Sequence, residues 1–209
     1  EDLCKDKMLS YKVFDEFMSK TFTATSKDEF YEAIKNIPGE MVVLKPIAGH
    51  GGKGVFIGLK EECKDKWENY SGEVMIQEFV DSREGIPELN FKGIHDLRIV
   101  IVNGVACACF LRKPKSGLIS NLSLGGDKIN VPLEDIPEGA IELFHKVDQN
   151  IENHNPRIYS IDMLRKNSGH WKLIELNSKP GIFRMDKDDE IQDIFLTKLT
   201  KVILDILHK

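Results

Sequence analysis

Three side chains with oxygen donors gather near the C-terminal end of the sequence: Asp162, Glu175 and Asn177. The stretches around them, YSIDMLR and WKLIELN, alternate apolar and polar residues, which predicts a hairpin with a two-residue turn at 167–168. That turn would set Asp162 opposite Leu173, so that Asp162 lies diagonally from Glu175 and on the same sheet face as Glu175 and Asn177. Two carboxylates and an amide on one face suit Mg²⁺, which takes a few protein oxygens together with water or nucleotide phosphates.

This metal hypothesis depends on the register of the hairpin. A shift of one residue would turn Asp162 to the opposite face and separate it from Glu175. The alternative is a solvated sheet face that carries ordinary polar residues. The apolar neighbours of both acids argue against full exposure, and two half-buried carboxylates without a cation would repel each other.

A second candidate site is the stretch VVLKPIAGHGGKGVFIG, in which four glycines fall within six positions between two apolar runs. Gly49, Gly51 and Gly54 match the dinucleotide pattern G-x-G-x-x-G, but that motif must open a helix and here a strand follows. The Walker A pattern also fails, because no Gly-Lys-Ser/Thr ends the loop. The stretch therefore predicts a strand, a flexible loop and a second strand, and the exposed N–H groups of such a loop favour an anion such as phosphate.

Two lysines strengthen the phosphate interpretation, because Lys45 and Lys53 can each bring an ammonium group to a phosphate oxygen. The alternative is a mobile hairpin with solvated lysines, and the loop by itself favours neither. His50, within the loop, is expected to be an exposed side chain.

The rest of the chain predicts the elements that position these residues. Apolar residues at helical spacing indicate a helix within residues 5–20, and Ser26 is a typical N-cap for the helix that follows. Asn103-Gly104 favours a tight hairpin turn, because both positions accept positive φ. Helices mixed with hairpins predict an α+β fold with two lobes, residues 1–80 and 81–209. The remaining expected elements are strands at 41–47, 54–58 and 73–80, a loop at 81–96, hairpins at 97–113 and 157–177, and helices at 60–69, 133–152 and 189–208.

The composition indicates a soluble globular protein. Hydrophobic residues make up 41% of the 209 positions, which is enough to build a core and unlike a disordered chain. A net charge of −5 argues against non-specific nucleic-acid binding, and no apolar run is long enough to span a membrane. The four cysteines lack metal-type spacing, and Cys107 and Cys109 are expected as buried thiols on one face of a strand, in a reducing, cytoplasmic setting. The sequence gives no indication of the oligomeric state.

Taken in order, the motifs are a lysine strand, the glycine flap, MIQEFV, an Asp-Leu-Arg strand, an arginine strand, SNLSLGG, and an Asp followed by Glu-x-Asn. This order resembles the ATP-grasp superfamily, and most closely its ribosomal-protein glutamate ligases and glutathione-synthetase-like enzymes. The resemblance extends over nearly the whole chain, from DKMLSYKVFDEF to ELNSKPG. It implies an α+β ATP-grasp fold in which two lobes hold ATP between antiparallel sheets. It also implies that the small α/β domain that usually precedes this region is absent from the sequence.

The resemblance implies a role for each motif in binding ATP. Lys45 would contact the phosphates under the flap, residues 78–80 would form a hinge whose backbone pairs with the adenine edge, and Asp96 would bind the ribose, with Glu84 as the alternative. The full set implied for the nucleotide is Lys45, Gly51, Gly52, Lys53, Gln77, Glu78, Phe79, Val80, Asp96, Ser120 and Asn121.

The same resemblance implies the metal and catalytic roles. Asp162, Glu175 and Asn177 would hold Mg²⁺, with two ions bridged by Glu175 and with Mn²⁺ as a substitute. Arg112 and Arg98 would stabilise the transferring phosphoryl group, the alternative being that each forms a salt bridge at the surface.

The activity implied is that of an ATP-dependent carboxylate–amine ligase. A substrate carboxylate would attack the γ-phosphate of ATP, Mg²⁺ and cationic side chains would offset the charge, and an amine would capture the acyl phosphate. The partners are therefore ATP, a carboxylate and an amine acceptor, without nucleic acid or membrane. Close relatives often have arginine where this chain has Ile119, so a phosphate or substrate contact is missing. The alternatives are a phosphotransferase with the same fold and a non-catalytic ATP-binding module.

Overall fold

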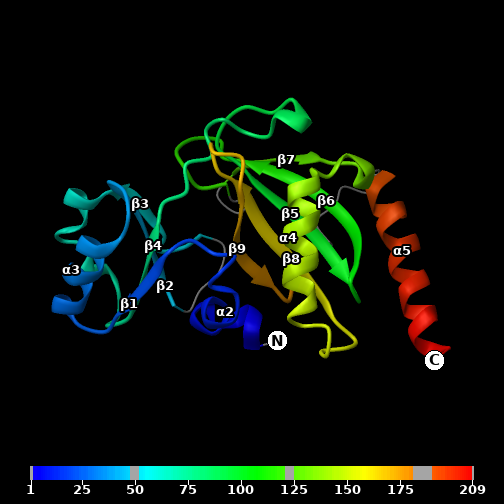
Figure 1. Ribbon diagram of the computed structural model, residues 1–209, viewed down its shortest axis with the longest axis horizontal. Helices are drawn as coiled ribbons and strands as arrows, with labels where there is room; N and C mark the ends of the chain where they lie inside the picture. The colour runs from blue at the N-terminus through cyan, green and yellow to red at the C-terminus, as the bar shows by residue number, and fades with distance from the viewer. Residues whose placement is uncertain (1, 48–51, 121–124, 181–189, 209) are drawn as a thin grey trace.

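The computed structural model describes residues 2–47, 52–120, 125–180 and 190–208. The strands form two separate antiparallel sheets, one of four strands and one of five, with helices packed against both (Figure 1). The expected α+β class is confirmed, because helices and antiparallel strands are mixed along the whole chain. The expected division into lobes at residue 80 stays a prediction.

Helix α3 (Lys27–Asn36) covers the outer face of the four-stranded sheet, where Phe30 packs among buried residues such as Leu44 and Ile76. The helix begins as predicted, because the Ser26 hydroxyl accepts a hydrogen bond from the Glu29 backbone N–H. The opposite face is left for the cleft described below. The strand order is β1-β4-β2-β3, formed by β1 (Thr21–Ala24), β4 (Val74–Glu78), β2 (Met41–Pro46) and β3 (Phe56–Leu59).

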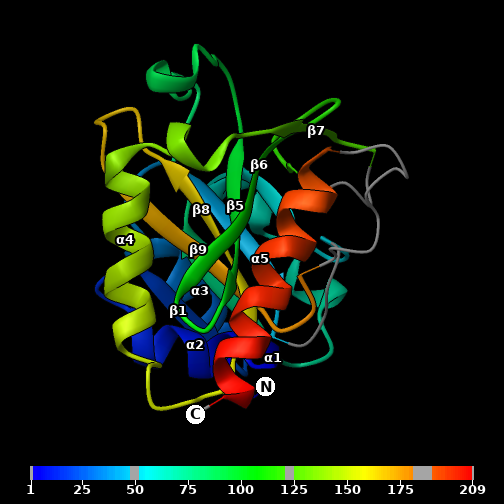
Figure 2. The ribbon, with the colours of Figure 1, turned by 90° about the vertical axis from the view of Figure 1, so that its right-hand side faces the viewer.

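The five-stranded sheet lies between two helices, α4 (Glu138–Gln149) and α5 (Glu190–Leu207), which Figure 2 shows on its opposite sides. Phe144 of α4 belongs to the large buried cluster on one face, and Phe195 of α5 packs on the other. The strand order is β7-β6-β5-β8-β9, formed by β7 (Asp127–Asn130), β6 (Val105–Lys113), β5 (Asp96–Val102), β8 (Ile158–Arg165) and β9 (Trp171–Asn177).

The sheet face under α5 changes character along its strands. Val100 and Phe110 are buried there against the helix. Two residues further along the same strands, Arg98 and Arg112 occupy the same face, because side chains alternate along a strand. Asp162 of β8 pairs directly with Arg98. One half of this face is therefore apolar and covered, and the other half is charged.

The N-terminal helices α1 (Asp2–Lys5) and α2 (Lys7–Phe14) precede the four-stranded sheet in sequence but pack on the five-stranded one. Phe14 is buried in its core, and the Leu173 N–H donates to the Phe17 carbonyl at 3.0 Å. The chain therefore crosses to the four-stranded sheet just before β1 and returns just after β4. The two crossings lie side by side, because the Glu78 N–H donates to the Lys20 carbonyl at 2.8 Å.

The register predicted for the β8–β9 hairpin is wrong. Its loop has three residues instead of two, with the Lys166 N–H donating to the His170 carbonyl at 2.8 Å and Gly169 at a φ of +91°. A bulge in β9 then adds one further residue, Ile174, between the partners of Met163 and Asp162. Asp162 therefore lies directly opposite Glu175, not diagonally from it.

Three other expectations differ from the structure. Residues 60–69 form two short 3₁₀ turns, Lys60–Cys63 and Trp67–Asn69, instead of one helix. Strands β1 and β7 were not expected. Cys107 and Cys109 are buried free thiols, but on opposite faces of the sheet, because Cys107 is the extra residue of a bulge opposite Val100 and Ile101. The tight turn at Asn103-Gly104 is confirmed, with φ values of 48° and 78°.

Within the part of the chain that the structure describes, every helix is too short or too polar to traverse a lipid bilayer.

Candidate active site

A cavity of about 170 Å³ lies between the inner face of the four-stranded sheet and the charged half of the five-stranded one. Most of the residues predicted to act on ATP line this single cleft, although they come from distant parts of the sequence. Those that do are Lys45, Gly52, Lys53, Gln77, Glu78, Phe79, Val80, Asp96, Arg112, Ser120, Asp162 and Glu175. Gly51 and Asn121, together with Gly49 and His50 of the flap, lie outside the described residues.

A second cavity, of about 540 Å³, adjoins the first at Lys45 and Glu175. Lys45 and Glu175 line both cavities, and Asn177 lines the second. Arg98 lines neither. Its guanidinium is instead engaged with Asp162.

One part of the cleft is formed by residues 78–80 and by the loop that follows. From this loop Ser82, Ile94 and His95 line the cleft, and none of the three was predicted. Glu84, the alternative ribose ligand, does not line it. Its backbone N–H instead donates a hydrogen bond to the Asn167 side-chain oxygen Oδ1 at 2.9 Å.

His95 fixes this loop to the end of β8. Its side chain is 1% exposed, with Nδ1 at 2.9 Å from the Gly93 carbonyl and Nε2 at 3.3 Å from the Arg165 backbone N–H. Because the backbone N–H of Arg165 donates, Nε2 must be the unprotonated nitrogen, and Nδ1–H donates to Gly93. Burial lowers the pKa of His95, so the neutral ring that these two hydrogen bonds require is also the form that its surroundings favour.

The phosphate end of the cleft carries three lysines: Lys7, Lys45 and Lys53. Lys7, in the first turn of α2, was not predicted. Lys45 donates from Nζ to the Gln77 side-chain oxygen at 2.8 Å. Burial lowers the pKa of Lys45, while the carboxylate of Glu175 acts in the opposite direction. This end of the cleft is therefore suited to an anionic group.

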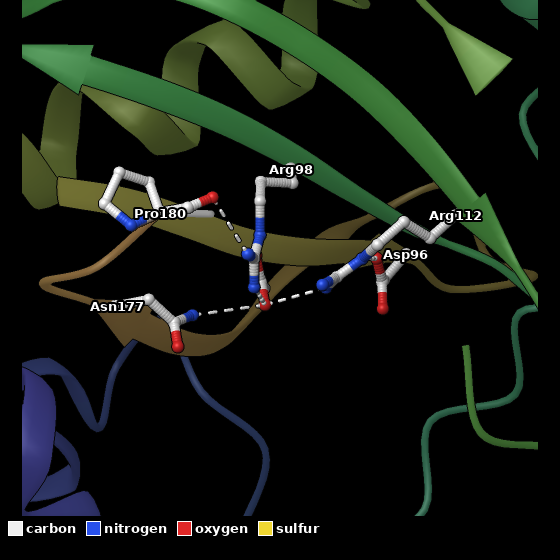
Figure 3. A network of polar contacts seen from close by, with 6 residues as sticks. Asp96, Arg98, Arg112, Asn177 and Pro180 are labelled. Atoms are coloured by element: carbon white, nitrogen blue, oxygen red, sulfur yellow. Dashed lines mark hydrogen bonds and ion pairs between the residues drawn. The ribbon is translucent and has the colours of Figure 1, made fainter. Parts of the chain in front are cut away.

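The charged half of the sheet holds a compact cluster of two acids and two arginines, which we call the charged cluster (Asp96, Arg98, Arg112 and Asp162). Figure 3 shows Arg98, Arg112 and Asn177 converging on one point, which is the Asp162 carboxylate. Arg98 donates to both Asp162 oxygens at 2.6 Å, and Arg112 donates to Oδ2 at 2.7 Å. Arg112 also donates to Asp96 at 2.5 Å.

Strand pairing explains this arrangement. Arg98, Asp162 and Glu175 are direct neighbours across β5, β8 and β9, and Asp96 pairs with Arg112 across β5 and β6. Burial alone would raise the pKa of Asp162, but the guanidinium groups of Arg112 and Arg98 outweigh it and hold that pKa below its ordinary value. Burial raises the pKa of Asp96 despite its contact with Arg112. Asp162 is therefore the acid whose charge the two arginines maintain.

The side chains left around the cluster fit a divalent cation that arrives with a nucleotide. No described residue donates a hydrogen bond to the Glu175 carboxylate, and Asn177 uses its nitrogen on Asp162 at 3.3 Å, which leaves the amide oxygen. Among the described residues, the Oδ1 of Asp162 accepts only from Arg98. Among the described residues no group of three or more His, Cys, Asp or Glu side chains is arranged to hold a metal, so phosphate and water oxygens would have to complete the shell of Mg²⁺.

Ser120 supplies a further polar group to the cleft. Its side-chain oxygen is buried and has no hydrogen-bond partner among the described residues. A buried hydroxyl without a partner is costly, and a bound phosphate oxygen would satisfy it. The preceding residue, Ile119, adds an apolar contact at the position where an arginine was expected.

Solved structures of other proteins share the fold of this chain. A solved structure of the ATP-grasp ligase PsnB, in complex with minimal precursor, Mg and ADP, matches with a TM-score of 0.60 at 10% identity, over 95% of this chain and 59% of that one. The fold is therefore the ATP-grasp fold, as the sequence implied.

The family follows from the sequence. Residues 4–202 match the model of the RimK-like ATP-grasp domain, so the chain belongs to the RimK-like ATP-grasp family. A probable alpha-L-glutamate ligase of Psychromonas ingrahamii is 28% identical over 79% of this chain and 51% of its own length. Beta-citrylglutamate synthase B of Danio rerio is 28% identical over 80% of this chain and 39% of its own length. The chain thus spans about half the length of the first of these relatives, and less of the second.

Asp162, inside the charged cluster, and Glu175, beside it, should respond differently to loss of their charge. Asp162→Asn should lower the free energy of unfolding by about 3 kcal/mol, because it leaves Arg98 and Arg112 short of their counter-charge. The matched variant Glu175→Gln should change it by less than about 0.5 kcal/mol, because no described residue hydrogen-bonds that carboxylate. Urea denaturation of both variants measures the difference, and equal losses would contradict the assignment.

His95 predicts a pH dependence of stability. Because its pKa is lowered in the folded state, the unfolded chain binds the extra proton first, and stability falls as the pH drops through the unfolded value near 6.5. Between pH 7.5 and 5.5 the free energy of unfolding should fall by up to about 1.4 kcal/mol because of His95. In His95→Gln this part of the fall should be absent when unfolding is measured at the two pH values. The exposed His154→Gln variant is the control. If the free energy of unfolding depends on pH in the same way in His95→Gln as in wild type, the His95 ring is not held neutral by the fold.

Proposed function

We propose that this chain is the nucleotide-binding and catalytic part of an ATP-dependent ligase that joins a carboxylate to an amine through an acyl phosphate. The observation that carries the proposal is that one cleft is lined by residues 78–80 and also by lysines beside Glu175 and the charged cluster. A nucleoside triphosphate has matching chemistry, with a base at one end and phosphates that need cations at the other.

The chain's own residues would act first by binding. The backbone of residues 78–80 would pair with the adenine edge, and Asp96 would be the candidate for the ribose although its carboxylate already accepts from Arg112. Lys7, Lys45 and Lys53 would neutralise the phosphates, with the Ser120 hydroxyl as a further donor. When bound through Glu175, Asn177 and Asp162, Mg²⁺ would draw charge from the transferring phosphoryl group. The binding of two ions bridged by Glu175 stays a prediction, as does the use of Mn²⁺ in place of Mg²⁺.

The reaction would then proceed in two displacements. A substrate carboxylate oxygen attacks the γ-phosphorus, the bond to the β-phosphate oxygen breaks, and ADP leaves. An amine next attacks the acyl carbon, loses a proton, and expels phosphate to leave an amide. Arg112 lines the cleft and is the arginine placed to stabilise the phosphoryl group, whereas Arg98 holds Asp162 and the Pro180 carbonyl, at 3.3 Å. Closure of the cleft would keep water from the acyl phosphate.

The second cavity supports a substrate that carries negative charge. It opens onto the phosphate end, where a substrate carboxylate has to meet the γ-phosphate. Its lining includes one acid, Glu175, against Lys5, Lys7, Lys45 and Lys179. Glutamate and citrate, the acidic compounds in the names of the two relatives above, have this chemistry. The identity of the carboxylate and of the amine, and a cytoplasmic location, stay predictions.

Calorimetry with a non-hydrolysable ATP analogue tests the nucleotide site. Wild type should bind the analogue more tightly with Mg²⁺ than without it, and Glu175→Ala should lose about tenfold or more of the Mg²⁺-dependent affinity, because its carboxylate is a proposed ligand. Glu134→Ala, which removes an exposed acid outside the cleft, is the matched control. Binding that is indifferent to Mg²⁺ and to Glu175 would contradict the proposed metal site.

Trapping with hydroxylamine separates the ligase from its two alternatives. With ATP, Mg²⁺ and a panel of acidic carboxylates that includes glutamate and citrate, an acyl phosphate should yield a hydroxamate together with ADP and phosphate. A phosphotransferase would release ADP without free phosphate or hydroxamate. A non-catalytic binding module would release neither ADP nor hydroxamate while still binding the analogue.

A further inference from the structure

The side chain of Gln77 is occupied within the protein, although it was expected to contact the nucleotide. Its oxygen accepts from Lys45 Nζ at 2.8 Å, and its nitrogen donates to the Thr21 hydroxyl at 3.0 Å. Gln77 is 5% exposed. Both ends of the amide are therefore engaged before any ligand arrives.

The direction of the amide is set by Thr21. The Thr21 hydroxyl lies 2.9 Å from the Ser19 carbonyl, to which it must donate its single proton. The same oxygen can therefore only accept from Gln77, which turns the amide nitrogen toward Thr21 and the amide oxygen toward Lys45. The Thr21 backbone N–H donates in turn to the Tyr11 hydroxyl at 3.2 Å. A reversed amide would face the Lys45 ammonium with its own N–H groups.

Strand pairing brings these residues onto the cleft face of the four-stranded sheet. Thr21 of β1 pairs with Gln77 of β4, and Gln77 pairs with Val43 of β2. Lys45 lies two residues beyond Val43 on the same face, diagonally from Gln77, within reach of its long side chain. The hydrogen bonds therefore run across three strands from Thr21 to Lys45.

Lys45 needs such a support more than most lysines. Its ammonium is carried on a flexible four-carbon chain, and Gln77 is its one hydrogen-bond partner among the described residues. A neutral partner of this kind orients the ammonium without cancelling its charge, which stays available to an anion. A carboxylate at position 77 would orient Lys45 equally well and neutralise it.

We propose that Thr21 and Gln77 are positioning residues, which hold Lys45 in the orientation that receives the phosphates of the nucleotide. The inference rests on the proposed nucleotide site and adds two residues that act through Lys45 without touching the ligand. The hydroxyl of Thr21 sets the direction of the Gln77 amide, and the amide oxygen sets the position of the ammonium.

The test compares a ligand that has phosphates with one that has none. Thr21→Val should weaken binding of the non-hydrolysable ATP analogue roughly five- to tenfold, which is the effect of losing one buried hydrogen bond, and leave adenosine binding unchanged. Thr23→Val is the matched control, since Thr23 lies on the same face of β1 but pairs with Met75. Thr21→Ser, which keeps the hydroxyl, should restore the affinity for the analogue.

Two further variants show whether the effect passes through Lys45. In a Lys45→Met background, Thr21→Val should cause no additional loss of analogue affinity. Gln77→Glu should weaken analogue binding by at least as much as Thr21→Val, because it neutralises Lys45, although its shape is conserved. A general disturbance of the sheet would instead reduce adenosine binding equally in these variants.

The outcomes are separable from failure of the proposed function. Analogue affinity unchanged in Thr21→Val, or lost in parallel with adenosine affinity, overturns the positioning role while wild-type binding of the analogue still supports the nucleotide site. If the wild-type protein binds the ATP analogue no more tightly than adenosine, both the positioning role and the proposed nucleotide site are overturned.

Discussion

A buried carboxylate requires nearby positive charge, and the rest of the site depends on the ion pairs that Asp162 makes with Arg98 and Arg112. Asp162 is 3% exposed, so its charge is stable only because Arg98 and Arg112 reach it from two neighbouring strands. Arg112 in turn donates to Asp96, which adds a second acid to the charged cluster. These contacts require β5, β6 and β8 to keep one register. Glu175, on the next strand, adds the acid that no described hydrogen bond satisfies, and it faces the cleft. The sheet thus presents the Glu175 carboxylate to a cation, beside an Asp162 carboxylate whose charge the arginines already offset.

Much of this could be predicted from the sequence, in part because two errors cancelled. The loop between β8 and β9 is one residue longer than predicted, which alone would have turned Asp162 away from Glu175. The bulge at Ile174 adds a second residue and restores the shared face. Alternation of apolar and polar residues identified both strands, but neither the loop length nor the bulge has a signal of comparable strength in a single sequence. The same limit explains Cys107, which a bulge in β6 moves to the face opposite Cys109.

The residues that the sequence did not indicate are those whose role depends on a distant partner. His95 appears as one histidine in a polar loop, and only the fold brings Arg165 to its ring. Thr21 is an ordinary strand residue until β1 pairs with β4. Lys7 is one of two lysines in α2, and only the packing of α2 against β9 brings it to the cleft.

The two chain crossings between the sheets have a mechanical consequence. The four-stranded sheet begins after Lys20 and ends at Glu78, and these residues are hydrogen-bonded to each other. Two adjacent tethers joined in this way resist translation and twisting, so they leave rotation about their common axis as the easiest relative motion. Thr21 and Gln77 sit beside that axis, where a given rotation displaces atoms least. Lys45, which hydrogen-bonds to Gln77, is therefore supported from the part of the sheet that such a rotation would displace least.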